Sequence, residues 1–580
     1  MTQSNKNYLH GATVLAAAVA VVKIIGAVYR IPIANILGDV GMSTFQVSFS
    51  IYQFLLIVST AGLPVALSKL VAAADALERP AQVRRVFVVG RNTFVALGTV
   101  SFLIMALFHR QLATISGSPS AAYGILALSP AVFFVGLISA YRGYCQGLSD
   151  MVPTSVSQVI EAVVRLGLGL GLAWLFHYWG WSSAITVAGA ILGVTVGTAL
   201  AAGYLFFAKR RVDRHRRMRD GLDVPDSNRR ISRNLLNIAV PLTLGASIFS
   251  LINIINNAVI LRRLQSVQGL AGAYLDEAVA YLAASRPYLE IGAAELSYIE
   301  AGLRYVEAQR LHGTYSMILP LFNLPSAFII PITVALIPAI SAFLTQGDGL
   351  RAKATAESGI RVTCLLAMPA GAGLMVLAGP VMDVLFYGRF AAQGPGLLVY
   401  MGAAAFFICF FQATNCVLQA YGFQRYTMYT LPIGGAISVG LNWILLGDPN
   451  ITIYGAAIST VACYVIISVM NLVLVKRNIP DPPSFRKILI RPFACTVVMA
   501  VAARAVYGLL SGILLDFPAI AGQYGIAGST RLPLTISLVG AIGLAMVVYL
   551  ALIIATRALT KEDMHMLPKG EKLAKILRVH

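Results

Sequence analysis

The chain has 580 residues, of which 58% are hydrophobic and only 12% are charged. A soluble domain carries roughly a quarter of its residues as charged side chains, so this composition excludes a water-soluble protein. The formal net charge of +20 would suggest nucleic-acid binding in a soluble chain. The positions of the charges, described below, argue against nucleic acid as a partner.

Apolar segments long enough to cross a bilayer follow one another along the chain. A hydrocarbon core of about 30 Å needs about 20 residues of helix. We predict fourteen spans, at 10–37, 44–73, 88–108, 121–141, 153–176, 184–208, 235–261, 314–345, 361–386, 397–420, 427–447, 453–475, 492–512 and 533–556. The predicted fold class is therefore an all-α polytopic membrane protein. The first apolar segment is too long for a cleavable signal peptide and lacks a small-residue cleavage site, so we expect none.

Basic residues gather in alternate loops. The loops on one side of the predicted membrane hold 31 Lys and Arg residues, against 8 on the other side. The segment 209–233 alone holds ten of them, and 476–491 holds five. Because cytoplasmic loops carry the excess of Lys and Arg, we expect a cytoplasmic-membrane protein with both termini in the cytoplasm. The basic loops are then expected to contact anionic lipids.

Similar short stretches recur about 273 residues apart. Ala61–Ala66 resembles Ala335–Ile340, and Gln146-Gly147 resembles Gln419-Ala420. Six spans fit each repeat, and an even number makes the repeats parallel, as in transporters built from two bundles around a cavity. The predicted domains are an N-terminal lobe at 1–234 with a basic linker at 209–233, a C-terminal lobe at 235–476 with an outer loop at 265–313, and two further spans with a basic tail at 477–580.

Proline residues and one long loop interrupt this pattern. We predict that Pro32, Pro64 and Pro338 break their helices and line the cavity, because proline removes a backbone hydrogen bond; plain bending of the helix is the alternative.

In the outer loop, the apolar residues from Leu296 to Val306 recur at helical spacing. This spacing predicts an amphipathic helix that lies over the outer opening of the cavity. The simplest role for such a helix is to cover this opening passively.

Charged residues inside the spans are costly and therefore mark candidate sites. The basic ones are Lys23, Arg30, Lys69, Arg165 and Arg504, and Glu161 is the clear acid. Lys23 and Arg30 lie two turns apart, with no acid near them in sequence. Glu161 and Arg165 can pair along one helix, and Lys69 and Arg504 can extend toward the membrane surface.

A net positive cavity favours an anionic ligand, and arginine suits phosphate because its planar group donates two parallel hydrogen bonds. We therefore expect Lys23, Arg30, Lys69, Glu161 and Arg165 to bind a phosphate or pyrophosphate headgroup. No catalytic motif stands out, and the six cysteines show no metal-binding spacing. We expect no enzyme activity, no metal and no cofactor. A coupling ion, Na⁺ or H⁺, or the membrane potential remains open as the energy source.

Several motifs resemble one family of membrane proteins. Arg142-Gly143-Tyr144-Cys145-Gln146-Gly147, followed by Met151–Glu161 and Arg165, resembles the signature between spans 4 and 5 of the stage V sporulation protein B and polysaccharide-biosynthesis group. This group belongs with the MurJ-type lipid II flippases in the MATE-like (MOP) superfamily. Supporting stretches are Gly26–Pro32, Gly62–Lys69 and Pro241–Gly245, and the resemblance extends from residue 10 to about 555.

The resemblance implies two six-helix lobes in a V, plus two C-terminal helices that shape a groove for a polyprenyl tail. It implies that the protein flips an undecaprenyl-pyrophosphate-linked sugar, such as lipid II, by alternating access, and that Arg30 grips the pyrophosphate. We also expect a monomer that works with cell-wall synthesis proteins, in growth or in sporulation. The chain departs from its relatives at Asn253–Asn257, where they tend to carry an acid, and in its longer outer loop.

Two other functions remain open. A drug or cation antiporter of the same fold would need acidic residues in its cavity, and this chain has few. A membrane glycosyltransferase or glycan polymerase could use Asp276, Glu277 and Glu290 of the outer loop as catalytic residues. The fourteen predicted spans and the two-lobe repeat argue against this enzyme.

Overall fold

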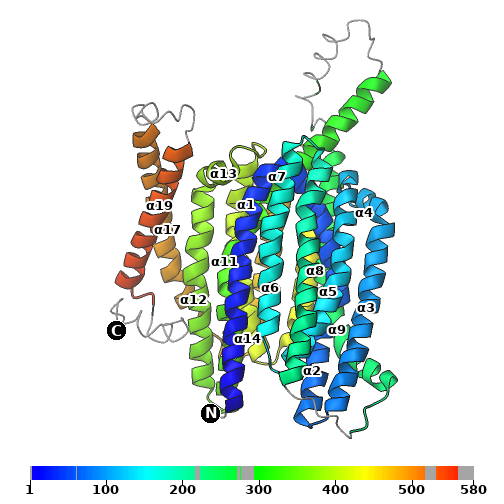
Figure 1. The fold of residues 1–580 in the computed structure, drawn as a ribbon. Coiled ribbons are helices and arrows are strands. Elements are labelled where there is room, and N and C mark those ends of the chain that lie inside the picture. Colours follow the sequence, from blue (N-terminus) through cyan, green and yellow to red (C-terminus); the bar gives the residue numbers. More distant parts are fainter. Residues whose placement is uncertain are drawn as a thin grey trace. The chain divides into compact units, whose positions relative to one another are not determined.

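The structure is a computed structural model that describes residues 3–60, 62–215, 223–268, 270, 275, 293–515 and 531–559. These residues form helices joined by turns, and no strand occurs among them (Figure 1). Thirteen helical segments of the described chain are long and apolar enough to cross a membrane, and the first, Val21–Ala76, contains two predicted spans. The prediction of an all-helical, multi-pass membrane protein is therefore confirmed.

Contacts divide the chain into two units, Met1–Gly313 and Thr314–His580. The first unit contains α1 (Gln3–Thr60), α2 (Leu63–Ala76), α3 (Pro80–Leu107), α4 (His109–Ile115), η1 (Pro119–Ala121), α5 (Ala122–Gly147), α6 (Val152–Val164), η2 (Arg165–Gly169), α7 (Leu170–Tyr178), α8 (Ser183–His215), α9 (Asn228–Gln265) and the beginning of α11 (Ala293–Thr345). The second unit contains the rest of α11, α12 (Gly349–Val376), α13 (Ala378–Phe386), α14 (Gly394–Ala420), α15 (Gln424–Leu445), α16 (Tyr454–Asn478), α17 (Phe485–Leu515) and α19 (Arg531–Ala555).

The boundary between these units differs from the predicted domain boundaries. We predicted that the C-terminal lobe begins at residue 235, but α9 packs on α1, α2 and α3 of the first unit. The backbone N–H of Gly62 donates to the Thr243 hydroxyl of α9 at 3.1 Å. The predicted segment 477–580 is also not separate, because α17 packs on α12 and the Tyr549 hydroxyl of α19 donates to the Leu365 carbonyl of α12 at 2.8 Å.

The helix breaks lie only partly at the predicted prolines. Pro64 lies in the first turn of α2, just after α1 ends at Thr60. Pro32 and Pro338 lie inside α1 and α11, which continue past them. That these three prolines line a cavity stays a prediction. The break in α1 occurs instead at Gly38, where φ is +67°. Glycine adopts this left-handed conformation without the strain that a side chain would add.

Part of the long outer loop is helical, as predicted. Residues from Ala293 onward form the first turns of α11, which continues without interruption to Thr345. At 53 residues this helix is far longer than the roughly 20 residues that one membrane crossing needs. The predicted amphipathic helix is therefore part of α11. The candidate catalytic residues Asp276, Glu277 and Glu290 lie outside the described residues.

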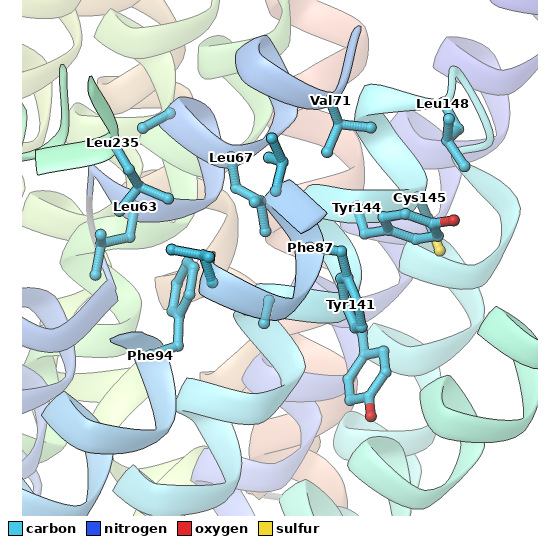
Figure 2. Packing of buried hydrophobic residues seen from close by; sticks show 14 of the residues in the cluster. Leu63, Leu67, Val71, Phe87, Phe94, Tyr141, Tyr144, Cys145, Leu148 and Leu235 are labelled. Atoms are coloured by element: carbon cyan, nitrogen blue, oxygen red, sulfur yellow. The ribbon is translucent and has the colours of Figure 1, made fainter. Parts of the chain in front are cut away.

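A cluster of buried residues fills the space between α2, α3, α5, α8 and α9 (Figure 2). Leu67 and Leu63 of α2 lie near Phe87 and Phe94 of α3, and the ring centroids of Phe87 and Tyr144 are 4.8 Å apart. Two glycines of α5, Gly143 and Gly147, bring α5 close to α2. A Cβ at Gly147 would lie 2.7 Å from the Ser68 carbonyl oxygen. Small residues four positions apart allow such close helix packing in membranes.

The two ends of the first unit differ in side-chain chemistry. At one end, the Tyr144 hydroxyl donates to Asp213 of α8 at 2.7 Å, beside the basic run Lys209–Arg211. We call this the basic end. The opposite end contains the break at Gly38 and the loop at Gly117, whose carbonyl accepts a hydrogen bond from Gln265. It also contains the end of α7 and the turn after it, with the exposed residues Trp174, Trp179 and Trp181. We call it the tryptophan end.

The glycine contact between α5 and α2 predicts a stability effect. Gly147→Ala places a Cβ against the Ser68 backbone and Val71, and we expect it to destabilise the protein by about 1–3 kcal/mol, as overpacking does. The melting temperature of the purified protein in detergent measures this effect. Gly171→Ala in α7 is the control, because its Cβ would have no neighbour within 4 Å. Equal melting temperatures for the two variants would contradict the packing described here.

Candidate functional site

Four ionisable side chains of the first unit lie on neighbouring apolar helices. Arg30 is on α1, Arg142 on α5, Glu161 on α6 and Arg165 at the start of η2. Three are cationic and one is anionic, so the group is formally positive. We call these four residues the cationic cluster. Arg30, Glu161 and Arg165 were predicted site residues, whereas Arg142 was not.

Arg142 and Glu161 form an ion pair between Nη2 and Oε1, and Arg142 Nε donates to the Ser157 hydroxyl at 2.9 Å. Both side chains are largely buried, with 18% and 28% of their surface exposed. The predicted pairing of Glu161 with Arg165 along the helix is therefore wrong. Arg142 takes that place because its guanidinium spans one turn of α6, from Ser157 to Glu161. The neutralised pair leaves Arg30 and Arg165 as the net charge of the cluster.

Arg165 turns toward α1. Its guanidinium carbon lies 5.6 Å from the ring centre of Tyr29, and a Cβ at Gly26 would lie 3.5 Å from its Nη2. Arg165 Nε is buried and has no hydrogen-bond partner within the described part of the chain. A buried donor without a partner is costly, and a ligand acceptor would satisfy it.

The backbone around Arg165 is a π-helix, Arg165–Gly169. Such single turns are rare, change the direction of side chains within a helix and occur often at functional sites. Glycine permits this turn to approach α8, because a Cβ at Gly193 would lie 2.5 Å from the Gly169 Cα. Gly167 in the same segment and Gly171 in α7 have open space around them, so Gly169 is the glycine of this stretch that serves the close approach.

Arg30 is held by aromatic rings rather than by a carboxylate. Its guanidinium carbon lies 5.2 Å from the Phe45 ring centre and 5.7 Å from that of Phe49. Its Nη1 donates a long hydrogen bond of 3.5 Å to Gln46 Oε1. These three partners lie on the part of α1 beyond Gly38, so the break at Gly38 brings them back over Arg30. Cation–π contacts stabilise a guanidinium without neutralising it, and the positive charge stays available to a ligand.

The remaining predicted site residues lie outside these contacts. Lys23 is partly buried on α1, two turns before Arg30. Lys69 is exposed on α2, which packs mainly on α3, α5 and α9. The sequence analysis did not predict Arg142 as a site residue, because the predicted span 121–141 ends just before it. Arg142 nevertheless opens the motif Arg142–Gly147 that carries the family resemblance. Its spacing from Glu161 across a helical hairpin could have identified it as the partner of this acid.

The cluster lies deep within the apolar part of the helices. Arg30 is eight residues from Gly38 and Arg165 is nine residues from Trp174. At 1.5 Å per residue these separations are roughly 12 Å and 14 Å. Exposed tryptophans such as Trp174, Trp179 and Trp181 are typical of a membrane–water interface. With the interface at the tryptophans, the guanidinium groups of Arg30 and Arg165 lie close to the middle of a core about 30 Å thick.

Sequence comparisons identify the relatives of this chain. The family model described as polysaccharide biosynthesis protein matches residues 8–344, and that of lipid II flippase MurJ matches residues 314–520. Stage V sporulation protein B of Bacillus subtilis (strain 168) is 24% identical over 97% of this chain and 98% of its own length. Lipid II flippase MurJ of the same organism is 24% identical over 81% of this chain and 82% of its own length.

Solved structures share the fold. A lipid II flippase MurJ in an inward closed conformation matches with a TM-score of 0.63 at 13% identity, over 94% of this chain and 98% of that chain. An inward-facing multidrug resistance MATE transporter of the MOP superfamily matches with a TM-score of 0.60 at 15% identity, over 79% of this chain and 98% of that chain. These structures confirm the predicted fold, and the two family-model matches confirm the resemblance to the polysaccharide-biosynthesis and MurJ proteins that the motifs indicated.

The ion pair of Arg142 and Glu161 predicts a coupling in stability. Removing one partner leaves the other charge partly buried and unpaired, so Arg142→Gln and Glu161→Gln should each destabilise the protein by about 1–3 kcal/mol, less than a fully buried pair because water reaches both groups. The double variant should lose less than the sum of the two. Unfolding in detergent measures this cycle.

The exposed pair Lys353–Asp481, with 60% of the Asp481 side chain in contact with solvent, is the control cycle, and its coupling should be close to zero. A coupling for Arg142 and Glu161 no larger than in this control would contradict the pairing.

Proposed function

The chain belongs to the polysaccharide biosynthesis protein family, and we propose that it is a flippase that moves an undecaprenyl-pyrophosphate-linked sugar precursor across the cytoplasmic membrane. Transport by alternating access needs no covalent chemistry, so we propose a transporter and not an enzyme. The observation that carries this proposal is the cationic cluster. Its Arg30 and Arg165 make aromatic contacts, and no described carboxylate forms an ion pair with either of them.

Charge decides the class of substrate. A guanidinium held in an apolar helix bundle is costly, and a bound pyrophosphate would offset this cost by supplying negative charge and acceptor oxygens. Arginine fits such a group because its planar donors match two phosphate oxygens. A cation antiporter would need free carboxylates at the same depth. The acid of this cluster is Glu161, and Arg142 already pairs with it.

The direction of transport follows from the proposed orientation. The basic end would face the cytoplasm, because Lys and Arg are retained on that side and contact anionic lipids there. Both termini would then also be cytoplasmic. An inside-negative membrane potential assists outward movement of a negative headgroup by about 2.3 kcal/mol per charge for each 100 mV. We propose this potential, alone or with a coupling ion, as the energy source, and a monomer as the working form.

The relatives support this assignment. Curated relatives include a stage V sporulation protein and a lipid II flippase, and the corresponding fold is that of a MurJ flippase and of MATE transporters. A lipid-linked wall precursor such as lipid II is therefore the first substrate to test. Proteins of cell-wall synthesis would supply it and consume it.

Transport in proteoliposomes tests the proposal. Lipid II flipped by the wild-type protein becomes accessible to a membrane-impermeant reagent on the far side. We expect Arg30→Ala and Arg165→Ala each to lower the initial rate at least ten-fold, about 1.4 kcal/mol or more. Arg30→Lys and Arg165→Lys should recover only part of the rate, because the charge returns without the planar donors.

Arg504→Ala is the matched control, because Arg504 is an exposed span arginine of α17 in the second unit, and its rate should equal that of wild type. Wild-type rates in the Arg30 and Arg165 variants would overturn the role of the cluster. No transport of lipid II by well-folded protein would redirect the assay to other lipid-linked glycans.

A further inference from the structure

Tyr29 of α1 is a buried side chain that contacts two other elements of the first unit. It directly precedes Arg30, and only 2% of its surface is exposed. The guanidinium carbon of Arg165, in η2, lies 5.6 Å from its ring centre. Its hydroxyl donates a hydrogen bond of 3.3 Å to the carbonyl of Ala190 in α8, a residue with no exposed surface. One side chain thus joins α1, η2 and α8 beside a member of the cationic cluster.

The helix α8 also supports the backbone that carries Glu161 and Arg165. A Cβ at Gly197 would lie 3.0 Å from the Glu161 carbonyl oxygen, and a Cβ at Gly193 would lie 3.2 Å from that of Arg165. The two glycines are four residues apart, as are the two charged residues, so these antiparallel segments pack along one face of each helix. With the backbone fixed in this way, the position of the Arg165 guanidinium depends on what its side chain contacts.

Gly169 leaves room for the hydrogen bond of Tyr29. A Cβ at Gly169 would lie 2.9 Å from the Ala190 carbonyl oxygen and 3.3 Å from the Tyr29 hydroxyl, so it would crowd the bond between them. The π-helix Arg165–Gly169 therefore has its first residue beside the ring of Tyr29 and its last residue beside the hydroxyl. The tyrosine and the π-helix are matched at both ends of this turn.

Arg165 has two candidate partners with opposite effects on its charge. Glu161 lies four residues earlier, a spacing that suits an ion pair, and such a pair would neutralise the cation. The ring of Tyr29 attracts a guanidinium and leaves its charge in place. In this structure Glu161 binds Arg142, and Arg165 lies against Tyr29. An arginine that is already ordered also loses less conformational entropy when it binds a ligand.

We propose that Tyr29 is a positioning residue that holds Arg165 in place for the pyrophosphate group. The ring of Tyr29 holds the guanidinium, and its hydroxyl, bonded to α8, holds the ring. The anionic ligand in this inference rests on the proposed function. Because Tyr29 is adjacent to Arg30, α1 then determines the positions of both arginines. Loss of the ring should free Arg165 to approach Glu161 and should weaken binding of the headgroup, while binding of the polyprenyl tail is unchanged.

Lipid binding to the full-length protein in nanodiscs tests this role. The ratio of the affinities for undecaprenyl pyrophosphate and uncharged undecaprenol reports the headgroup, because both lipids share one tail. Tyr29→Leu should lower this ratio about ten-fold, as loss of a desolvated cation–π contact would. Tyr29→Phe should lower it about three-fold, as loss of one hydrogen bond would. The affinity for undecaprenol should stay unchanged in both variants, whereas general damage to the fold would lower it as well.

A glycine variant leaves Tyr29 in place and covers the case in which Tyr29→Leu does not fold. Gly169→Ala crowds the hydrogen bond of Tyr29 and should lower the affinity ratio about three-fold. Gly167→Ala is the matched control in the same turn, because its Cβ would have no neighbour within 4 Å, and it should keep the wild-type ratio. A wild-type ratio in both Gly169→Ala and Tyr29→Phe would overturn the role of the hydroxyl.

Double variants decide whether Tyr29 acts through Arg165. In an Arg165→Ala background, Tyr29→Leu should lower the affinity ratio no further. An equal loss in that background, or a wild-type ratio in Tyr29→Leu alone, would overturn the proposal.

Unfolding of the lipid-free protein separates this inference from the proposed function. Tyr29→Leu and Arg165→Ala should be coupled about five-fold in the unfolding constant, because each removes the same cation–π contact. Independent effects would overturn the contact on which the proposal depends. Coupling in a wild-type protein that does not prefer the pyrophosphate would count against the proposed function and leave the hold of Tyr29 on Arg165 intact.

Discussion

The energetic cost of holding guanidinium groups within an apolar helix bundle is the constraint on which the first unit depends. Three arginines meet there, and each is accommodated differently. Arg142 pairs with Glu161 and Ser157, and Arg30 lies against the rings of Phe45 and Phe49. Arg165 lies against Tyr29, and its Nε has no hydrogen-bond partner among the residues that the structure describes. Only the first arrangement neutralises its charge. The other two keep positive charge at depth, as a site for an anion requires.

The geometry of α1 links this site to the tryptophan end. Arg30 precedes the break at Gly38, and the residues that follow the break supply both its aromatic partners and Ser43, which contacts Gln309 and His312 of α11. A change in the path of α1 at Gly38 would therefore move the rings over Arg30 and the contacts of Ser43 together. Interfaces of buried polar groups switch between discrete arrangements rather than deforming gradually, so this helix is a suitable element for coupling the end of the bundle to the ligand.

The sequence predicted the helices well because long apolar segments leave little choice in a membrane, where each backbone group must be hydrogen-bonded within its own segment. It also identified Arg30, Glu161 and Arg165, because charge inside such segments is conspicuous. It did not predict what depends on contacts between distant segments. The partner of Glu161 comes from α5, the break of α1 is at Gly38 rather than at Pro32, and α9 packs with the first unit. A buried network of neutral residues such as Ser43, Asn257 and Gln309 has no signature in composition at all.

Direct binding tests the central claim most simply, because it separates recognition of the headgroup from transport. Undecaprenyl pyrophosphate and uncharged undecaprenol can be titrated against the purified protein and against a variant that combines Arg30→Ala and Arg165→Ala. The account predicts that the wild-type protein binds the pyrophosphate at least ten-fold more tightly than the alcohol, and that this preference disappears in the double variant while binding of the alcohol is unchanged. Equal affinity of the wild-type protein for both lipids would contradict a cationic site for the pyrophosphate.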